Sequence, residues 1–207
     1  MSNPWEQVPL NVYEAHMQLK DVAQLPALSR IMRKQLRQYP IETVAILGVA
    51  GGNGLEHIDP KQISRVYGID INDQYLAACQ KRFAHLQSCL SVMRLDLSDA
   101  SVALPAADLY IANLLIEYTG VAAFVSQISR VMPRLVSCVI QKNANAPFVS
   151  VSPYREALSG LSDFHCDIDA DGLTAGLCGA GYQLLLTEEY PLPGGKSLIR
   201  LDYAQSL

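Results

Sequence analysis

The feature that most constrains the fold is an apolar run that leads directly into a glycine-rich loop. Residues 43–47 have the composition of a buried strand, and four glycines and one alanine occur within residues 48–54. Glycine adopts backbone angles that other residues avoid, and it places no Cβ in the way of a ligand. Because the loop follows the end of the strand, it predicts a site where a nucleoside lies against the main chain.

A second apolar run ends in a carboxylate at the spacing that such a site requires. Residues 65–70 read Arg-Val-Tyr-Gly-Ile-Asp, which places Asp70 about 20 residues after the start of the glycine loop. In nucleotide-binding α/β folds, a carboxylate here accepts charge-assisted hydrogen bonds from ribose hydroxyls. The loop and Asp70 together predict a nucleoside site more strongly than either does alone.

Further apolar runs alternate with helical patterns along the chain. Helical periodicity follows Asn72, the expected N-cap, as far as Leu86, and it recurs over residues 121–132. The alternation indicates a doubly wound, parallel sheet, and runs that are nearly continuous are typical of strands buried on both faces. Strand-like runs occur at residues 66–69, 90–95, 109–112 and 136–140.

The C-terminal part of the chain departs from this alternation of strands and helices. Residues 182–187 and 197–203 are strand-like, and no helix fits in the Pro/Gly-rich stretch of residues 188–196 between them. We therefore expect these two strands to be antiparallel neighbours at the end of a mostly parallel, seven-stranded sheet. Helices are expected before them, at residues 154–161 and 172–178.

Length and composition favour one α/β domain with an extension. The 207 residues, half of them apolar, are enough for one well-buried core and few for two full domains. We assign residues 1–40 to an N-terminal helical extension and residues 41–207 to the domain. The extension is either a lid on the site or an arm packed on the body or on a second subunit, which leaves a homodimer open.

Charge, cysteine usage and hydropathy exclude several classes of protein. A formal net charge of −4 provides no overall positive field that would attract the phosphate backbone of nucleic acid. The chain has no signal pattern and no run of about 18 apolar residues, so we expect a cytoplasmic protein without a membrane partner. The cysteines lack zinc-site spacing and are expected to be small buried residues in a reducing compartment, with no metal site; they are Cys79, Cys89, Cys138, Cys166 and Cys178.

The order of these motifs resembles the class I S-adenosylmethionine-dependent methyltransferases, from about Thr43 to Tyr203. The glycine loop stands at the family's G-x-G-x-G motif, and Asp70 at its ribose-binding acid. Asp96 matches a residue that contacts the adenine amino group, and the motif ending near Asn113 faces methyl donor and substrate. The resemblance implies a three-layer α/β/α Rossmann-like fold with S-adenosyl-L-methionine as cofactor, held by Gly48, Ala50, Gly52, Gly54, Asp70, Ile71, Asp96, Leu97 and Asn113.

Two positions depart from the family pattern. Ile46 occupies the place of an acid that, in the family, orders the loop and helps to receive the methionine end of the cofactor. Ala50 stands where the second glycine is expected. A backbone contact, or a carboxylate such as Glu56, is a candidate substitute for the missing acid.

Methyl transfer from a sulfonium requires few side chains, because the protein mainly aligns the acceptor with the methyl group and excludes water. Where the acceptor must lose a proton, histidine is a suitable base near neutral pH. His16 and His165 are the better candidates, since His57 is placed to pack or cap and His85 to face solvent.

Residues 113–118 follow the fourth strand, where acceptor and cofactor would meet. They do not form the N-P-P-Y motif of enzymes that methylate nucleobases or glutamine amides, so a small-molecule acceptor is favoured. The predicted catalytic residues are His16, Tyr118 and His165.

Two other functions remain open from the sequence. A protein that binds the nucleoside without catalysis would explain Ile46 and the absence of an obvious base. A nicotinamide-dependent dehydrogenase shares the loop and the distant acid, but its G-x-G-x-x-G fingerprint needs glycine at Ala50 and Asn53.

Overall fold

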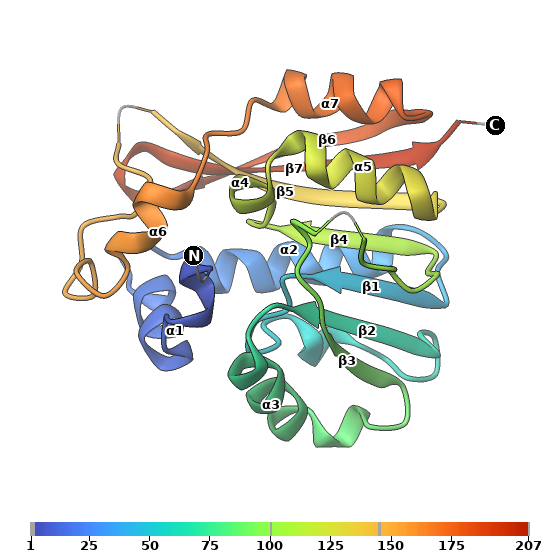
Figure 1. Ribbon diagram of the computed structural model, residues 1–207, viewed down its shortest axis with the longest axis horizontal. Coiled ribbons are helices and arrows are strands. Elements are labelled where there is room, and N and C mark those ends of the chain that lie inside the picture. Colours follow the sequence, from blue (N-terminus) through green and yellow to red (C-terminus); the bar gives the residue numbers. More distant parts are fainter. Residues whose placement is uncertain (1–2, 100, 145, 207) are drawn as a thin grey trace.

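The computed structural model describes residues 3–99, 101–144 and 146–206. A seven-stranded sheet with the order β3-β2-β1-β4-β5-β7-β6 runs through the molecule (Figure 1). Strands β1 to β5 are parallel, and β7 pairs antiparallel with both β5 and β6, as predicted. The strands are β1 (Thr43–Leu47), β2 (Arg65–Asp70), β3 (Leu90–Arg94), β4 (Leu109–Asn113), β5 (Leu135–Asn143), β6 (Tyr182–Leu192) and β7 (Lys196–Gln205).

Helices cover both faces of this sheet. In β1, Val44 and Ile46 pack into an apolar cluster with α2 and α3, whereas Ala45 and Leu47 pack into a cluster with α5 and α7. Alternate residues of a strand point to opposite faces, so a continuous apolar run is what a sheet buried on both sides requires. The helices are α1 (Leu10–Gln18), α2 (Gln24–Gln38), α3 (Asp73–Arg82), α4 (Ile116–Thr119), α5 (Val121–Val131), α6 (Ser159–Phe164) and α7 (Ala170–Gly179).

Two expected boundaries are wrong. The helix expected at residues 154–161 begins only at Ser159, because the preceding residues form turns and the Ser152 hydroxyl accepts a hydrogen bond from the Tyr154 N–H. The expected loop at residues 188–196 is mostly strand, since β6 continues to Leu192 and pairs with β7 throughout. As an edge strand, β6 tolerates Pro191.

The expectation that all five cysteines are buried is also partly wrong. Cys79, Cys89 and Cys138 are buried in the apolar clusters, but Cys166 and Cys178 are exposed. Cys178 lies near the end of α7, and Cys166 follows α6 at the surface. Among the described residues, no helix combines the length and apolar character needed to cross a lipid bilayer.

A chain of buried polar side chains crosses the antiparallel part of the sheet. Arg200 and Asp202 on β7 are 1% and 0% exposed, and the Arg200 Nε donates to Asp202 Oδ1 at 2.9 Å. The Ser137 hydroxyl on β5 also donates to Asp202 and accepts from Gln35 Nε2 on α2. Gln35 pairs through both ends of its amide with Asn113, which brings this chain to the end of β4.

Asn72 joins the start of α3 to the N-terminal segment. Its predicted role as the N-cap of α3 is confirmed, whereas its contact with the N-terminal segment was not predicted. Its Oδ1 accepts from the Gln74 and Tyr75 N–H groups at 2.9 and 3.2 Å, and its Nδ2 donates to the Trp5 carbonyl at 2.8 Å. We expect Asn72→Ala to lower the free energy of unfolding by about 1 kcal/mol, the usual cost of losing an N-cap. Urea unfolding followed by circular dichroism measures the loss.

Asn72→Asp is the matched control for this variant. An aspartate retains the oxygen that caps α3 but lacks the amide donor to Trp5, so it should preserve most of the stability. If Asn72→Ala unfolds at the same urea concentration as the wild type, the cap contributes nothing measurable and the expectation is contradicted.

Candidate active site

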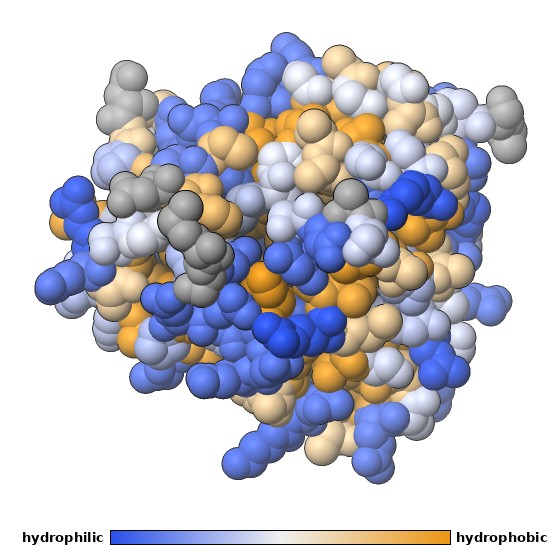
Figure 2. Space-filling view, in the orientation of Figure 1, coloured by the Kyte–Doolittle hydropathy of each residue, from blue (hydrophilic) through white to orange (hydrophobic). Residues whose placement is uncertain are grey.

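A hollow lies at the ends of β1, β2 and β4, and we call it the Asp70 hollow. It contains about 730 Å³ of space between protein atoms, including its mouth. Figure 2 shows apolar side chains near the centre of this face, among largely hydrophilic ones. Seven of the nine predicted cofactor residues line the hollow: Gly48, Ala50, Asp70, Ile71, Asp96, Leu97 and Asn113.

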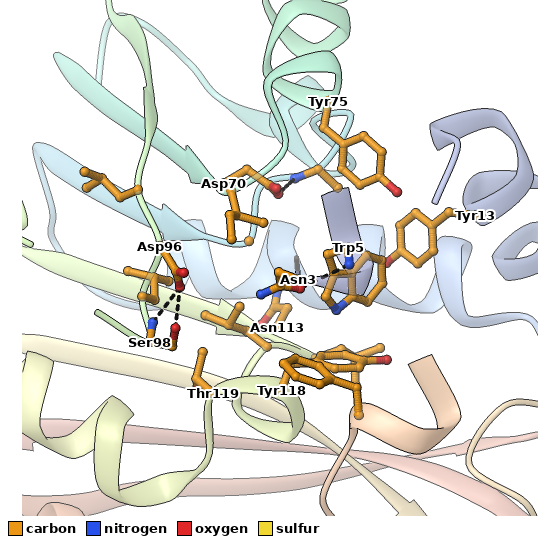
Figure 3. Close-up of a pocket in the computed structure, with 18 residues that line it drawn as sticks. Asn3, Trp5, Tyr13, Asp70, Tyr75, Asp96, Ser98, Asn113, Tyr118 and Thr119 are labelled. Carbon is orange, nitrogen blue, oxygen red and sulfur yellow. Dashed lines mark hydrogen bonds between the residues drawn. The ribbon is translucent and has the colours of Figure 1, made fainter. Parts of the chain in front are cut away.

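Two acidic residues lie on one side of the Asp70 hollow and aromatic residues on the other (Figure 3). Asp70 is the last residue of β2 and Asp96 follows β3, and the two lie on the same side because parallel strands end at the same edge of the sheet. Trp5, Tyr13 and Tyr118 form the aromatic side. Neither Trp5 nor Tyr13 belongs to the glycine-loop motifs, and both come from the N-terminal segment.

Asp70 is held by backbone N–H groups. Its Oδ2 accepts from Ala50 N at 2.9 Å and its Oδ1 from Asn72 N at 3.0 Å, and its side chain is 9% exposed. Burial raises the pKa of Asp70, while these N–H groups act in the opposite direction. A carboxylate oxygen has more than one acceptor position, so each oxygen can still accept from a ligand in the hollow.

Asp96 also has a structural partner. Its Oδ1 accepts hydrogen bonds from the Ser98 N–H at 2.9 Å and from the Ser98 hydroxyl at 2.6 Å (Figure 3). These bonds fix the turn after β3, while Asp96, Leu97 and Ser98 all line the hollow. The Asp96 side chain thus stabilises a turn, as aspartate commonly does, and it also lies beside the space available to a ligand.

The other two predicted cofactor residues, Gly52 and Gly54, face packed side chains instead of the hollow. A Cβ on Gly52 would lie 2.6 Å from a ring carbon of Phe83, and one on Gly54 would lie 2.7 Å from the sulfur of Met32. Both residues also have positive φ angles, of 90° and 96°. Their absence of a side chain therefore permits close packing and the turn.

The loop is ordered without an acid at position 46. Ile46 is 4% exposed, and the Gly48 and Val49 N–H groups donate to the Ile69 carbonyl at 2.8 and 3.0 Å. Glu56 accepts from the Gly54 N–H and from the Ser29 hydroxyl, so it supports the far end of the loop. It lines none of the hollows described in this section.

A different carboxylate reaches the loop, in a second site that we call the Glu14 hollow. Glu14, on α1, lines it together with Ile46, Gly51 and Asn113. The Glu14 carboxylate accepts from both terminal nitrogens of Arg82, at 2.7 and 2.9 Å, and Arg82 Nη1 also donates to the Gly51 carbonyl at 2.9 Å. Sequence analysis missed this role, because only the tertiary fold brings α1 to the loop.

A third site, the His16 hollow, adjoins the Asp70 hollow. It contains about 430 Å³ of space between protein atoms, open solvent at its mouth included, and shares Trp5, Tyr13, Leu114 and Tyr118 with its neighbour. His16 lines it and is 5% exposed, with Nδ1 at 2.8 Å from the Ser152 hydroxyl. Burial, and secondarily the charge of Lys196, lower the pKa of His16, which favours a neutral imidazole near pH 7.

The structure separates the three predicted catalytic residues. His16 and Tyr118 meet at the His16 hollow, whereas His165 lines none of the three hollows and stacks on the ring of Phe148 at 3.8 Å. Burial raises the pKa of the Tyr118 phenol well above its usual range, so this group stays protonated. Of the other histidines, His57 contacts Ser29 and Glu56, and His85 is exposed.

Gln141 and Phe148 are among the residues lining the His16 hollow that were not anticipated as site residues. They come from β5 and the segment after it, where no motif distinguishes them from ordinary core residues. Tyr13, from the N-terminal extension, lines all three hollows. Within residues 3–99, 101–144 and 146–206, no cluster of three or more side chains suited to a metal ion is found.

Comparison with known proteins excludes one of the functions left open by the sequence. A family model described as "Methyltransferase domain" matches residues 46–139, which contain the glycine loop, Asp70, Asp96 and Asn113. The chain contains a class I S-adenosylmethionine-dependent methyltransferase domain. The dehydrogenase alternative is thereby set aside, and S-adenosylmethionine is the cofactor of this domain.

Solved structures share the fold of the methyltransferase domain at low sequence identity. Magnesium protoporphyrin IX methyltransferase (ChlM) from Synechocystis PCC 6803, with bound SAM, is 14% identical with a TM-score of 0.62 over 95% of this chain and 83% of its own. N-methyltransferase NodS from Bradyrhizobium japonicum WM9, in complex with S-adenosyl-l-homocysteine, is 11% identical with a TM-score of 0.66, over 94% and 98%. No curated protein matches the sequence of this chain.

Proposed function

We propose that this methyltransferase domain transfers the methyl group of S-adenosylmethionine to a small organic molecule. The observation that carries the proposal is the pair of adjoining hollows, which share Trp5, Tyr13, Leu114 and Tyr118 as a common wall. The His16 hollow is the smaller of the two and is lined mostly by apolar side chains. Such a site suits a compact acceptor better than a polymer.

The cofactor would occupy the Asp70 hollow and extend into the Glu14 hollow. Ile71 and Leu97 provide apolar walls for adenine, Asp96 an acceptor for its amino group, and Asp70 acceptors for the ribose hydroxyls. The amino-acid end would lie at the glycine loop, where Glu14 supplies a carboxylate despite Ile46. The sulfonium supplies an activated methyl group, so this chain has to align the acceptor and exclude water.

We further propose that residues 1–40 act as an extension that closes the site over the domain of residues 41–207. Trp5 and Val8 accept hydrogen bonds from Asn72 and Tyr75 through their carbonyl oxygens, each at 2.8 Å. Ion pairs of Glu6 with Arg94 and of Glu14 with Arg82 also join the segment to the domain. These four contacts support a lid over the cofactor as well as over the acceptor.

Calorimetric titration tests the cofactor part of the proposal. The full chain should bind S-adenosylmethionine and S-adenosylhomocysteine with micromolar dissociation constants, because the Asp70 contacts are charge-assisted. NAD serves as the negative control. If neither S-adenosylmethionine nor S-adenosylhomocysteine gives a binding signal, the proposed site is contradicted.

Methyl transfer tests the catalytic part. The protein, incubated with S-adenosylmethionine labelled in its methyl group and a mixed set of small phenols, amines and carboxylates, should yield labelled products. Cofactor binding without transfer to any compound of such a set would instead support a protein that binds the nucleoside without catalysis.

A further inference from the structure

The walls of the His16 hollow are suited to a flat ring. Trp5 lies edge-on to Tyr13 and Tyr118, with ring centroids at 5.3 and 4.9 Å, and Tyr118 lies edge-on to Phe148 at 5.9 Å. All four rings line the hollow. Aromatic rings prefer stacked or edge-to-face neighbours, so this set offers favourable contacts to an aromatic guest.

The hollow also excludes a charged guest. In the part of the chain that the structure describes, no aspartate, glutamate, lysine or arginine lines it. A carboxylate or an ammonium group buried there would lose its hydration without gaining an ion-pair partner, which is costly. The guest should therefore carry no net charge.

Gln24 offers the first of two hydrogen-bond acceptors in the hollow. Gln24 Nε2 donates to Gln141 Oε1, and Gln141 Nε2 donates to the Asn143 side chain and to the Phe148 carbonyl, so the Gln141 amide is occupied. For Gln24 Oε1, no donor is found among the described residues. The guest is expected to bring a donor, such as a hydroxyl group.

His16 is the second acceptor. Its Nδ1 lies 2.8 Å from the Ser152 hydroxyl, which itself accepts from the Tyr154 N–H at 3.1 Å. With the proton on Nδ1 donated to Ser152, Nε2 keeps its lone pair. No protein partner of Nε2 is found within residues 3–99, 101–144 and 146–206, and His16 lines the hollow.

A buried lysine holds one part of the aromatic wall and lies close to His16. Lys196 is 6% exposed, and its Nζ donates to the Phe148 carbonyl at 2.6 Å and to the Ser150 hydroxyl at 2.9 Å. These bonds fix Phe148, which forms part of the aromatic wall. Burial and, secondarily, the positive charge of Lys196 lower the pKa of His16, and the charge also disfavours a cation in the hollow.

We propose that the His16 hollow binds an uncharged aromatic alcohol of the phenol class and that His16 is the base for its hydroxyl group. The inference rests on the proposed methyl transfer. As the phenol oxygen forms its bond to the methyl carbon, the carbon–sulfur bond breaks and its electron pair returns to sulfur. The hydroxyl proton passes to His16 Nε2 and then to water, so the products are an aryl methyl ether, S-adenosylhomocysteine and one proton.

Substrate panels test the class of acceptor. Wild-type protein with methyl-labelled S-adenosylmethionine should methylate phenol, catechol or 2-naphthol, and should leave benzoate and benzylamine unmodified. The single tryptophan of the chain, Trp5, lines the hollow and reports binding directly. Its fluorescence should change saturably with 2-naphthol and remain unchanged with benzoate.

His16→Gln tests the base, and His85→Gln is its matched control because His85 is exposed and lies outside the hollows. Removal of a general base typically lowers turnover by about 10²- to 10⁴-fold. We expect that loss in His16→Gln, with affinity for S-adenosylmethionine within twofold of the wild type by calorimetry and an unchanged melting temperature. His85→Gln should retain full turnover.

The outcomes separate this inference from the proposed function. Methylation of benzoate or benzylamine in place of the phenols would overturn the inference while leaving methyl transfer to a small molecule intact. Undiminished turnover in His16→Gln would overturn the assigned base. Absence of S-adenosylmethionine binding in the wild type would contradict the proposed function itself.

Discussion

Asp202→Ala is expected to lower the free energy of unfolding by about 3–5 kcal/mol, the usual cost of removing one partner from a buried ion pair. Arg200 would keep its longer contact with Glu188, at 3.6 Å from Nη1. Arg200, only 1% exposed, would lose the carboxylate that accepts from its Nε and Nη2. The hydroxyls of Ser137 and Tyr39 would lose the same acceptor. Urea unfolding followed by circular dichroism measures the loss, with Asp21→Ala, a change at an exposed aspartate, as the control.

A double variant shows whether the stability lost in Asp202→Ala comes from the buried charge of Arg200. Replacing a buried ion pair with apolar residues of similar size is often neutral or stabilising. Arg200→Met combined with Asp202→Leu should therefore recover most of the stability lost in Asp202→Ala. If the double variant is as unstable as the single one, the cost lies in the lost hydroxyl contacts and the explanation by an unpaired charge is wrong.

Asp70→Ala is expected to weaken binding of S-adenosylmethionine by about 1.5–3 kcal/mol, or roughly ten- to a hundredfold, the range for hydrogen bonds to a charged group. The carboxylate lines the Asp70 hollow and holds the Ala50 N–H of the glycine loop. Calorimetry measures the affinity. Asp73→Ala is the control, since Asp73 is nearby but its side chain is 71% exposed and lines none of the three hollows.

A ligand without ribose hydroxyls distinguishes a direct contact from an effect through the loop. If Asp70 binds the hydroxyls, their removal from methylthioadenosine should weaken binding to the wild type but cost little more in Asp70→Ala, because coupled changes are not additive. Additive losses would assign Asp70 to loop ordering alone. Unchanged affinity in Asp70→Ala would remove it from the cofactor site.

The sheet could be predicted because its signals are local. Strands buried on both faces, such as residues 43–47, need continuous apolar runs, and the parallel strands placed Asp70 and Asp96 at one edge. The cap at Asn72 was equally readable, since it depends on one side chain and the next three residues. These elements required no knowledge of distant contacts.

The rest of the site depends on contacts between segments far apart in the chain. Glu14 reaches the glycine loop only because α1 packs there, and Phe148 reaches His16 through the segment after β5. Gly52 and Gly54 show a second limit of prediction from sequence. A motif cannot distinguish a glycine that faces a ligand from one that allows a side chain such as Phe83 or Met32 to pack closely. Local periodicity carries neither kind of information.

Tyr13 gives the site a thermodynamic property of its own, because its ring forms part of the wall of all three hollows. A ligand that settles Tyr13 in one position in one hollow has already done so for the others. Binding of cofactor and acceptor is then linked, and linkage is reciprocal: the factor by which the cofactor raises affinity for the acceptor equals the factor by which the acceptor raises affinity for the cofactor. A ligand that shifts Tyr13 in one hollow would thus change the affinity of the neighbouring hollow for its own ligand by this shared factor.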